Sequence, residues 1–591
     1  MIFELSKLFL KDTKKRLRPS NQAPDKGVRA FVNKPTIGLV YWLLVWLAAF
    51  LLMMVPTLPE VGNGGGPVHH SLGVGGPLRL VPGRASPITV VSAGTVIVER
   101  GQKVDAKTIG KIRDYQAQVK ADEPFSSRLQ KLAGDGLLLF LGLMVTAIMF
   151  RFACLGSASG KIWGPSRAIS PNSMILLFLL VSLLSLAPVK WLLWMDFDRL
   201  PWLAPLVEAL MPLALAPLLM SILINPSAGI VAGFWVSFAA AGLADYRINV
   251  FVTGLIVTAV VVRSARAVRS RSKLFRIGLW AGLAGAASAA GFAAIGMPGY
   301  EFVLPQCLAS LASGVFSALV AMLLLPLLEL IFGISTDISL LELSDLEHPL
   351  LKRLAIEAPG TYHHSLMVAN LTQAAVAAIG GNALRAGICA YFHDIGKLAK
   401  PAFFSENIQY GQNPHDDLSP SMSTLLIISH VKEGVNLALR HKLPRAVVEA
   451  IQQHHGSGLV FYFYHKANVQ RGQAAPDAAA SDVKEEDFRY PGPKPQSREI
   501  AVLSLADAIE AASRSLEKIT AGNLEDLVRD VMDSKLRDGQ LDACDLTLAE
   551  INTIRRVLTL TLSNILHGRV AYPSNENIRP QPADAAPSER S

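Results

Sequence analysis

Histidine and aspartate residues gather in the last third of this 591-residue chain at spacings that suit metal chemistry. Most of the thirteen histidines follow residue 347. In chain order the candidates are Tyr362-His363-His364, His393-Asp394-Ile395-Gly396-Lys397, His430, His454-His455 and Ala506-Asp507. A single histidine on a helix is usually a core or surface residue. Several histidines joined by two aspartates, however, supply the imidazole nitrogens and carboxylate oxygens that bind iron, manganese or zinc. No cysteine accompanies them, which argues against a structural zinc site.

The order His, His-Asp and then a distant Asp is the signature of HD-domain metallohydrolases. In these proteins a helical bundle brings the four side chains onto one divalent metal. Here the ligands would be His364, His393, Asp394 and Asp507. Chemistry alone does not decide between His363 and His364 as the first ligand.

The remaining histidines predict a second metal. His430, His454 and His455 are enough to hold it if Asp394 donates one oxygen to each ion. Two metals about 3.5–4 Å apart can share a water, lower its pKa and hold it in line with a phosphorus atom. This is the apparatus for phosphodiester hydrolysis by a metal-activated hydroxide. Lys397 could offer a point charge to a phosphate, although a surface lysine fits the sequence equally well.

The elements that position these residues belong to a membrane protein. Hydrophobic residues are 51% of the chain and charged residues 17%, and the mean hydropathy is +0.35. This balance is typical of chains with long segments in lipid. We expect an anchor over 36–54 and further spans near 136–153, 174–194, 202–224, 228–244, 248–262, 276–297 and 303–333.

The distribution of positive charge predicts the topology of these spans. Arginines and lysines crowd the loop at 263–276, which should be cytoplasmic, as should the basic N-terminal arm. Six spans lie between the arm and this loop, and two more return the chain to the cytoplasm. Residues 58–135 would then lie outside and the C-terminal third inside. The net charge of +9 therefore indicates topology rather than binding of a nucleic acid polymer.

The predicted fold class is a multi-span α-helical membrane protein with a small extracytoplasmic α+β domain and a cytoplasmic all-α HD-domain bundle. The expected domains are a basic arm (1–35), an anchor (36–57), the extracytoplasmic domain (58–135), a seven-span region (136–333), an amphipathic connector ended by Pro349 (334–349), the HD domain (350–572) with a disordered insert (467–486), and a disordered tail (573–591).

Two segments carry a close family resemblance. Glu357–Ser365 (EAPGTYHHS) and Tyr391–Lys397 (YFHDIGK) resemble the HD domain of the seven-transmembrane HD receptor family, whose characterised members are PgpH-type cyclic-di-AMP phosphodiesterases. Further matches are Asn413-Pro-His415, Leu418-Ser-Pro420, Ile428-Ser-His430, Gln453-His-His-Gly456, Asp487–Gln496 and Leu505-Ala-Asp-Ala508. The resemblance covers the whole chain, although the segment over 58–135 is shorter than is common in the family.

The resemblance implies a centre of two divalent metals, iron or manganese, and hydrolysis of cyclic-di-AMP to the linear dinucleotide pApA. The implied ligands are His364, His393, Asp394, His430, His454, His455 and Asp507, with His364 preferred over His363. The implied location is a bacterial inner (plasma) membrane, with the HD domain in the cytoplasm. The expected partners are the cyclic dinucleotide and the lipid bilayer. The sequence leaves a homodimer open and identifies no external ligand.

Three alternatives remain at this point. HD-GYP phosphodiesterases cleave cyclic-di-GMP, but they place a GYP-containing run after the paired histidines, where this chain has Gly456-Ser-Gly-Leu-Val460. A nucleotide triphosphohydrolase or alarmone hydrolase needs only the four-ligand core and leaves three histidines unexplained. A non-catalytic receptor would be favoured by the loss of a ligand, and none is lost.

Overall fold

The structure is a computed structural model that describes residues 35–54, 124–155, 170–195, 202–266, 268–295, 302–408, 413–473, 483–516 and 520–567. The regular secondary structure of the described residues is helical, apart from one β-bridge that joins Leu459 to Arg489. The chain divides into two compact units, Met1–Ser339 and Leu340–Ser591, each with its own hydrophobic core. The predicted basic arm and tail lie outside the described residues, apart from Pro35.

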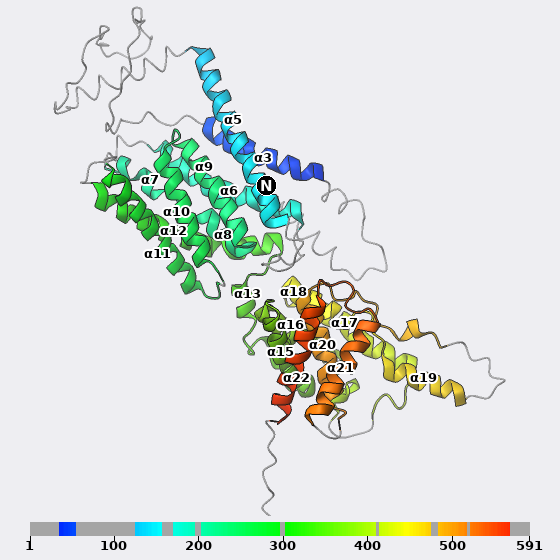
Figure 1. The fold of residues 1–591 in the computed structure, drawn as a ribbon. Coiled ribbons are helices and arrows are strands. Elements are labelled where there is room, and N and C mark those ends of the chain that lie inside the picture. Colours follow the sequence, from blue (N-terminus) through cyan, green and yellow to red (C-terminus); the bar gives the residue numbers. More distant parts are fainter. Residues whose placement is uncertain are drawn as a thin grey trace, which may run out of the picture. The chain divides into compact units, whose positions relative to one another are not determined.

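The first unit is a bundle of apolar helices (Figure 1). Its elements are α3 (Pro35–Met54), α5 (Phe125–Phe150) continued by the π-helical turn η1 (Arg151–Leu155), α6 (Pro171–Trp194), η2 (Ala204–Leu206), α7 (Val207–Leu210), α8 (Leu215–Leu223), α9 (Pro226–Leu243), α10 (Ile248–Ser264), α11 (Arg271–Ala294) and α12 (Val303–Phe332). Within the described residues, seven helical segments are long and apolar enough to cross a membrane. The span predicted near 248–262 corresponds to α10, a shorter apolar helix that contacts α9 and α11. The chain is therefore a multi-span α-helical membrane protein.

Glycines bring two of these helices into close contact. A β-carbon on Gly314 of α12 would lie 2.4 Å from the carbonyl oxygen of Gly278 and from the amide nitrogen of Gly282, both on α11. Gly278 and Gly282 are four residues apart and so share one helix face. Only the missing side chains allow the two backbones to approach this closely, as is common between membrane helices.

The span predicted over 202–224 is not one continuous helix. Between α7 and α8 the helix is interrupted over 211–214. Pro212 lacks an amide hydrogen and disfavours helical geometry in Met211. The carbonyl oxygen of Met211 accepts a hydrogen bond from Ser313 Oγ on α12 at 2.8 Å. A backbone group at the break is thus hydrogen-bonded inside the bundle.

The predicted boundaries on either side of the membrane region need correction. Helix α5 begins at Phe125, so the last residues assigned to the extracytoplasmic domain (58–135) belong to a membrane helix. The predicted α+β structure in the rest of that domain lies outside the described residues. In the predicted connector, α13 (Asp337–Glu342) is short. Pro349 is the first residue of the next helix, a position where its missing amide hydrogen costs no hydrogen bond.

The second unit is an all-helical bundle that carries the metal-type residues (Figure 1). Its elements are α14 (Pro349–Glu357), α15 (Pro359–Ala378), α16 (Ala383–Phe392), η4 (Ile395–Ala399), η5 (Pro401–Phe403), η6 (Ser405–Asn407), α17 (Pro420–Arg440), α18 (Arg445–Gln453), α19 (Phe461–Gln473), η7 (Glu485–Phe488), α20 (Arg498–Ser513), α21 (Ala521–Arg537) and α22 (Leu548–His567). The side chains of Asn382, Ser419 and Ser497 accept hydrogen bonds from the first turns of α16, α17 and α20 and fix where these helices begin. Helices α15, α16 and α20 to α22 share one buried core.

The predicted disordered insert (467–486) overlaps ordered structure at both ends. Helix α19 continues to Gln473, and η7 begins at Glu485. Phe463 of α19 is buried against the ring of His415, and Tyr464 contacts Phe488. These aromatic contacts stabilise a helix that its polar composition disfavours. Residues 474–482 lie outside the described part of the chain.

Candidate metal centre

All seven predicted metal ligands meet in the second unit. They form two overlapping groups, one of His364, His393, Asp394 and Asp507 and the other of Asp394, His430, His454 and His455. Within each group the candidate ligand atoms lie within 4.8 Å of one another. Asp394 belongs to both groups, as a bridging carboxylate would.

The ligands come from helices and helix ends that the shared core holds in place. His364 lies on α15, His430 on α17 and Asp507 on α20. His393 directly follows α16, and His454 directly follows α18. His364 is buried whereas His363 is exposed, so the structure places the second histidine of the pair in the site.

The two oxygens of Asp394 face different histidines. Oδ2 lies 3.3 Å from His393 Nε2 and 3.6 Å from His364 Nε2. Oδ1 lies 3.4 Å from His430 Nε2 and 3.6 Å from His454 Nε2. One carboxylate thus divides its oxygens between the two groups.

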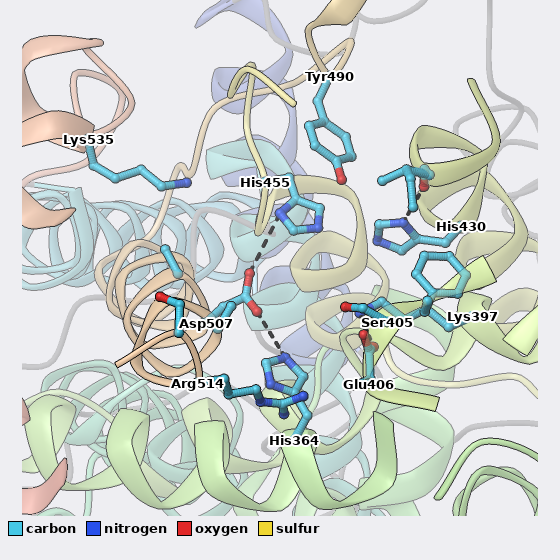
Figure 2. A pocket seen from close by; sticks show the side chains of 15 residues that line it. His364, Lys397, Ser405, Glu406, His430, His455, Tyr490, Asp507, Arg514 and Lys535 are labelled. Carbon is cyan, nitrogen blue, oxygen red and sulfur yellow. Dashed lines mark hydrogen bonds and ion pairs between the residues drawn. The ribbon is translucent and has the colours of Figure 1, made fainter. Parts of the chain in front are cut away.

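Asp507 also faces both groups. Its Oδ1 lies 3.0 Å from His364 Nε2, and its Oδ2 lies 3.6 Å from His455 Nδ1. Figure 2 shows Asp507 between these two imidazoles, with a contact drawn to each. His455 is therefore joined to the first group as well as to the second.

Backbone carbonyl groups orient three of the imidazoles. Nδ1 of His393 donates to the carbonyl oxygen of Ala390 at 2.8 Å, and the Nδ1 atoms of His430 and His454 donate to residues three positions earlier at 2.6 and 2.9 Å. A carbonyl oxygen can only accept, so Nδ1 of each ring carries a proton, and Nε2 is the nitrogen that faces the centre and could bind a metal.

These Nε2 atoms are what make the site fit a metal. The Nε2 atoms of His393, His430 and His454 and Oδ1 of Asp394 are buried and have no hydrogen-bond partner among the described residues. An unsatisfied buried polar atom is costly, and four of them within the two groups are explained by bound cations. The buried cluster is thus consistent with divalent metal binding.

Burial and neighbouring charges act differently on the two groups. Burial lowers the pKa of His430 to about 4 and holds that of His455 well below its ordinary value. Both imidazoles are then neutral at pH 7, as metal binding requires. Burial would also lower the pKa of His393, but the charge of Asp394 outweighs it and raises the value to about 10. A cation binding there must displace that proton.

Lys397 lies beside Asp394, the carboxylate that the two groups share. Its Nζ is 2.8 Å from Asp394 Oδ2 and 2.6 Å from Glu406 Oε1. Burial would lower the pKa of this lysine, but the charges of Asp394 and Glu406 outweigh it and raise the pKa. The ammonium therefore stays charged and helps to keep Asp394 ionised. Whether it also contacts a phosphate remains a prediction.

A cavity of about 550 Å³ opens onto the centre. The candidate ligands His364, His430, His455 and Asp507 line it, and so do Lys397, Glu406, Tyr490, Arg514 and Lys535. Figure 2 shows these polar side chains around the centre. The ring of Tyr490 stacks on His455, with centroids 4.3 Å apart.

Sequence reasoning missed a residue behind the centre. Glu510 accepts a hydrogen bond from His364 Nδ1 and is itself held by Arg514, whose Nη2 lies 2.8 Å from Glu510 Oε1. Glu510 follows Asp507 by three residues on α20, so both side chains lie on one helix face. The spacing of Glu510 from Asp507 was the signal in the sequence that could have identified Glu510 as a residue near the centre.

Replacing Glu510 by glutamine should weaken metal binding through His364. A carboxylate behind a ligating histidine orients the ring and makes it more basic, and its loss typically costs roughly 10- to 100-fold in metal affinity. Mn²⁺ titration of the purified chain, followed by elemental analysis, measures this affinity. Glu525→Gln, an exposed change on α21, is the matched control. Equal affinities in the two variants would exclude the orienting role.

The fold and site together define a helical membrane protein with an HD-type cluster of buried histidine and aspartate side chains that is consistent with metal binding. Residues 137–336 match the family described as 7TM receptor with intracellular HD hydrolase, and residues 361–512 match the HD domain family. The chain belongs to this family of seven-transmembrane HD proteins, as its motifs indicated.

Named relatives share much of the chain. Cyclic-di-AMP phosphodiesterase PgpH of Bacillus subtilis (strain 168) is 34% identical over 453 residues, which are 74% of this chain and 60% of that protein. Cyclic-di-AMP phosphodiesterase PgpH of Listeria monocytogenes serotype 1/2a (strain 10403S) is 32% identical over 508 residues, 83% of this chain and 65% of that protein. The chain thus spans less than two thirds of the length of either relative. The crystal structure of the L. monocytogenes PgpH HD domain with cyclic-di-AMP is 42% identical and covers 37% of this chain and 98% of that domain, with a TM-score of 0.35.

Proposed function

We propose that this chain is a membrane-anchored, metal-dependent phosphodiesterase that hydrolyses cyclic-di-AMP to the linear dinucleotide pApA. The observation that carries the proposal is the sharing of Asp394 between two groups of buried metal-type side chains. One metal alone would need only His364, His393, Asp394 and Asp507. The second group is what a phosphodiester reaction at two ions requires.

The seven side chains named above would hold two divalent ions, and iron or manganese suits their mixture of imidazole and carboxylate ligands. When bound, such ions supply an activated water and neutralise charge on the phosphoryl oxygens. Asp394 divides its two oxygens between the groups. Lys397 and Glu406 hold Asp394 in this orientation, and Lys397 adds positive charge at the cavity wall.

The cavity supports a substrate larger than a simple phosphate ester. Its volume of about 550 Å³ and its cationic lining by Lys397, Arg514 and Lys535 suit an anionic dinucleotide. The two named relatives are cyclic-di-AMP phosphodiesterases, which favours adenine over guanine. A cyclic-di-GMP phosphodiesterase is the second candidate, since the same metal chemistry would serve it.

Steady-state hydrolysis by the purified full-length chain in detergent with Mn²⁺ or Fe²⁺ tests this proposal. Cyclic-di-AMP, cyclic-di-GMP and a nucleoside triphosphate are offered in parallel. We expect turnover of cyclic-di-AMP to pApA with the highest kcat/KM. A preference for cyclic-di-GMP would move the chain to the second candidate, and turnover of the triphosphate alone would contradict both.

We also propose that the second unit faces the cytoplasm of a bacterial cell from its inner membrane. The basic residues of the loop between α10 and α11, together with the span order, support this orientation. Reporter fusions within 264–275 and after residue 570 should report a cytoplasmic location, and a fusion after residue 120 an external one. An external signal from the 264–275 fusion would overturn this topology.

A further inference from the structure

Three cationic side chains line the cavity, and two of them are already neutralised. Lys397 contacts Asp394 and Glu406, and Arg514 contacts Glu510. Lys535 differs. Among the described residues it forms no ion pair within 4.0 Å, and its one hydrogen-bonding contact is Ser504 Oγ at 3.5 Å. A positive charge therefore faces the cavity without a protein anion to balance it.

Lys535 reaches the cavity from a different helix and a different side. It lies on α21, which packs against α20, the helix that carries Asp507. Figure 2 shows Lys535 and Lys397 on opposite sides of the labelled histidines and Asp507. A β-carbon on Gly458 would lie 3.9 Å from Lys535 Nζ, which places the ammonium beside the loop that follows His455. The positive charge of Lys535 is thus next to the centre and separate from that of Lys397.

An uncompensated ammonium at this position is unfavourable for the free protein. Burial lowers the pKa of Lys535, and the charges of Asp507 and Asp538 only partly offset it. Burying a cation is costly unless an anion pairs with it. Lys535 belongs to neither group of candidate metal ligands, so a role in holding a metal does not account for it. An anionic group in the cavity would remove the cost.

A cyclic dinucleotide brings two phosphodiesters, of which only one can be cleaved at a time. With the first at the metal-type residues, the second remains in the cavity with its charge. We propose that Lys535 binds this second, uncleaved phosphate and so selects substrates that carry two phosphates. This proposal rests on the proposed function, because it assigns a binding role within the same cavity.

The test compares two phosphodiesters in the full-length enzyme with Mn²⁺. Cyclic-di-AMP carries two phosphates, and bis(p-nitrophenyl) phosphate carries one. The Lys535→Met variant keeps the length of the side chain and removes its charge. A hydrogen bond to a charged group is worth enough that its loss should raise KM for cyclic-di-AMP roughly 10- to 100-fold. We expect kcat to change less than about twofold, because Lys535 would bind the second phosphate equally well before and during the reaction. Hydrolysis of bis(p-nitrophenyl) phosphate should stay unchanged, because this substrate has no second phosphate.

Two further variants sharpen the result. Lys535→Arg retains the charge and should restore most of the KM. Arg537→Gln removes a positive charge from an exposed site on the same helix and should behave as the wild type. An unchanged KM in Lys535→Met would overturn the proposal, and so would a parallel loss with both substrates, which indicates a structural role.

The outcome also separates this proposal from the one on which it rests. If the wild type hydrolyses bis(p-nitrophenyl) phosphate but no cyclic dinucleotide, the proposed function fails and the role of Lys535 fails with it. If the wild type hydrolyses cyclic-di-AMP and Lys535→Met does so with the same KM, only the role of Lys535 fails.

Discussion

Replacing Asp394 by alanine is expected to remove both metal ions and to lower turnover on the order of 10⁴-fold. Asp394 is the one side chain shared by the two groups, and its oxygens face different histidines. An imidazole cannot take this place, because its two nitrogens point in different directions and only one of them can face the centre. No single histidine change should therefore cost as much.

Elemental analysis of the purified variant, together with its turnover of cyclic-di-AMP, measures this effect. Asp417→Ala, an exposed change in the same unit, should retain both ions and full turnover. Thermal unfolding of both variants shows whether the fold survives. A folded Asp394→Ala protein that keeps two ions per chain would contradict the bridging role.

The His454→Ala variant is expected to lose chiefly one ion and still lose most of its activity. His454 Nε2 lies near Asp394 Oδ1 and belongs only to the second group. The four side chains of the first group, His364, His393, Asp394 and Asp507, remain to hold the other ion. If the reaction needs both ions, turnover should fall by at least about 10²-fold although one ion stays bound.

His363→Ala is the matched control for this change, because His363 is an exposed histidine of the same unit that lies next to a ligand position. It should retain both ions and its turnover. Full activity in His454→Ala with one ion per chain would contradict the two-ion mechanism. The chain would then be assigned to the broader class of mononuclear HD hydrolases.

The sequence was informative where chemistry restricts residue types. Few side chains bind divalent metals, so the order of His364, the His393-Asp394 pair and Asp507 could be read before the fold was known. The membrane spans were equally clear, because a helix that crosses the bilayer needs about 20 consecutive, mostly apolar residues. The described helices follow the predicted order of spans from α3 to α12.

Features that depend on tertiary packing could not be predicted in this way. Glu510 and Lys535 are ordinary charged residues of amphipathic helices until the bundle turns them toward the centre. The break at Pro212 is compatible with the hydropathy pattern, but the hydrogen bond that Ser313 donates to Met211 from a helix distant in sequence appears only in the folded bundle. The last residues of α19, 467–473, were predicted to be disordered from their polar composition, whereas the aromatic contacts that stabilise this helix involve Phe463 and Tyr464 in its first turn.

If this chain hydrolyses a cyclic dinucleotide at two metal ions held by Asp394, its turnover should depend on the binding of the second ion. The most direct test is the rate of cyclic-di-AMP hydrolysis by the metal-depleted full-length chain as Mn²⁺ is added back, with bound ions counted at each step. We expect pApA to form at an appreciable rate only as the second ion binds. Full turnover with one ion per chain, or no turnover with two ions bound, would contradict it.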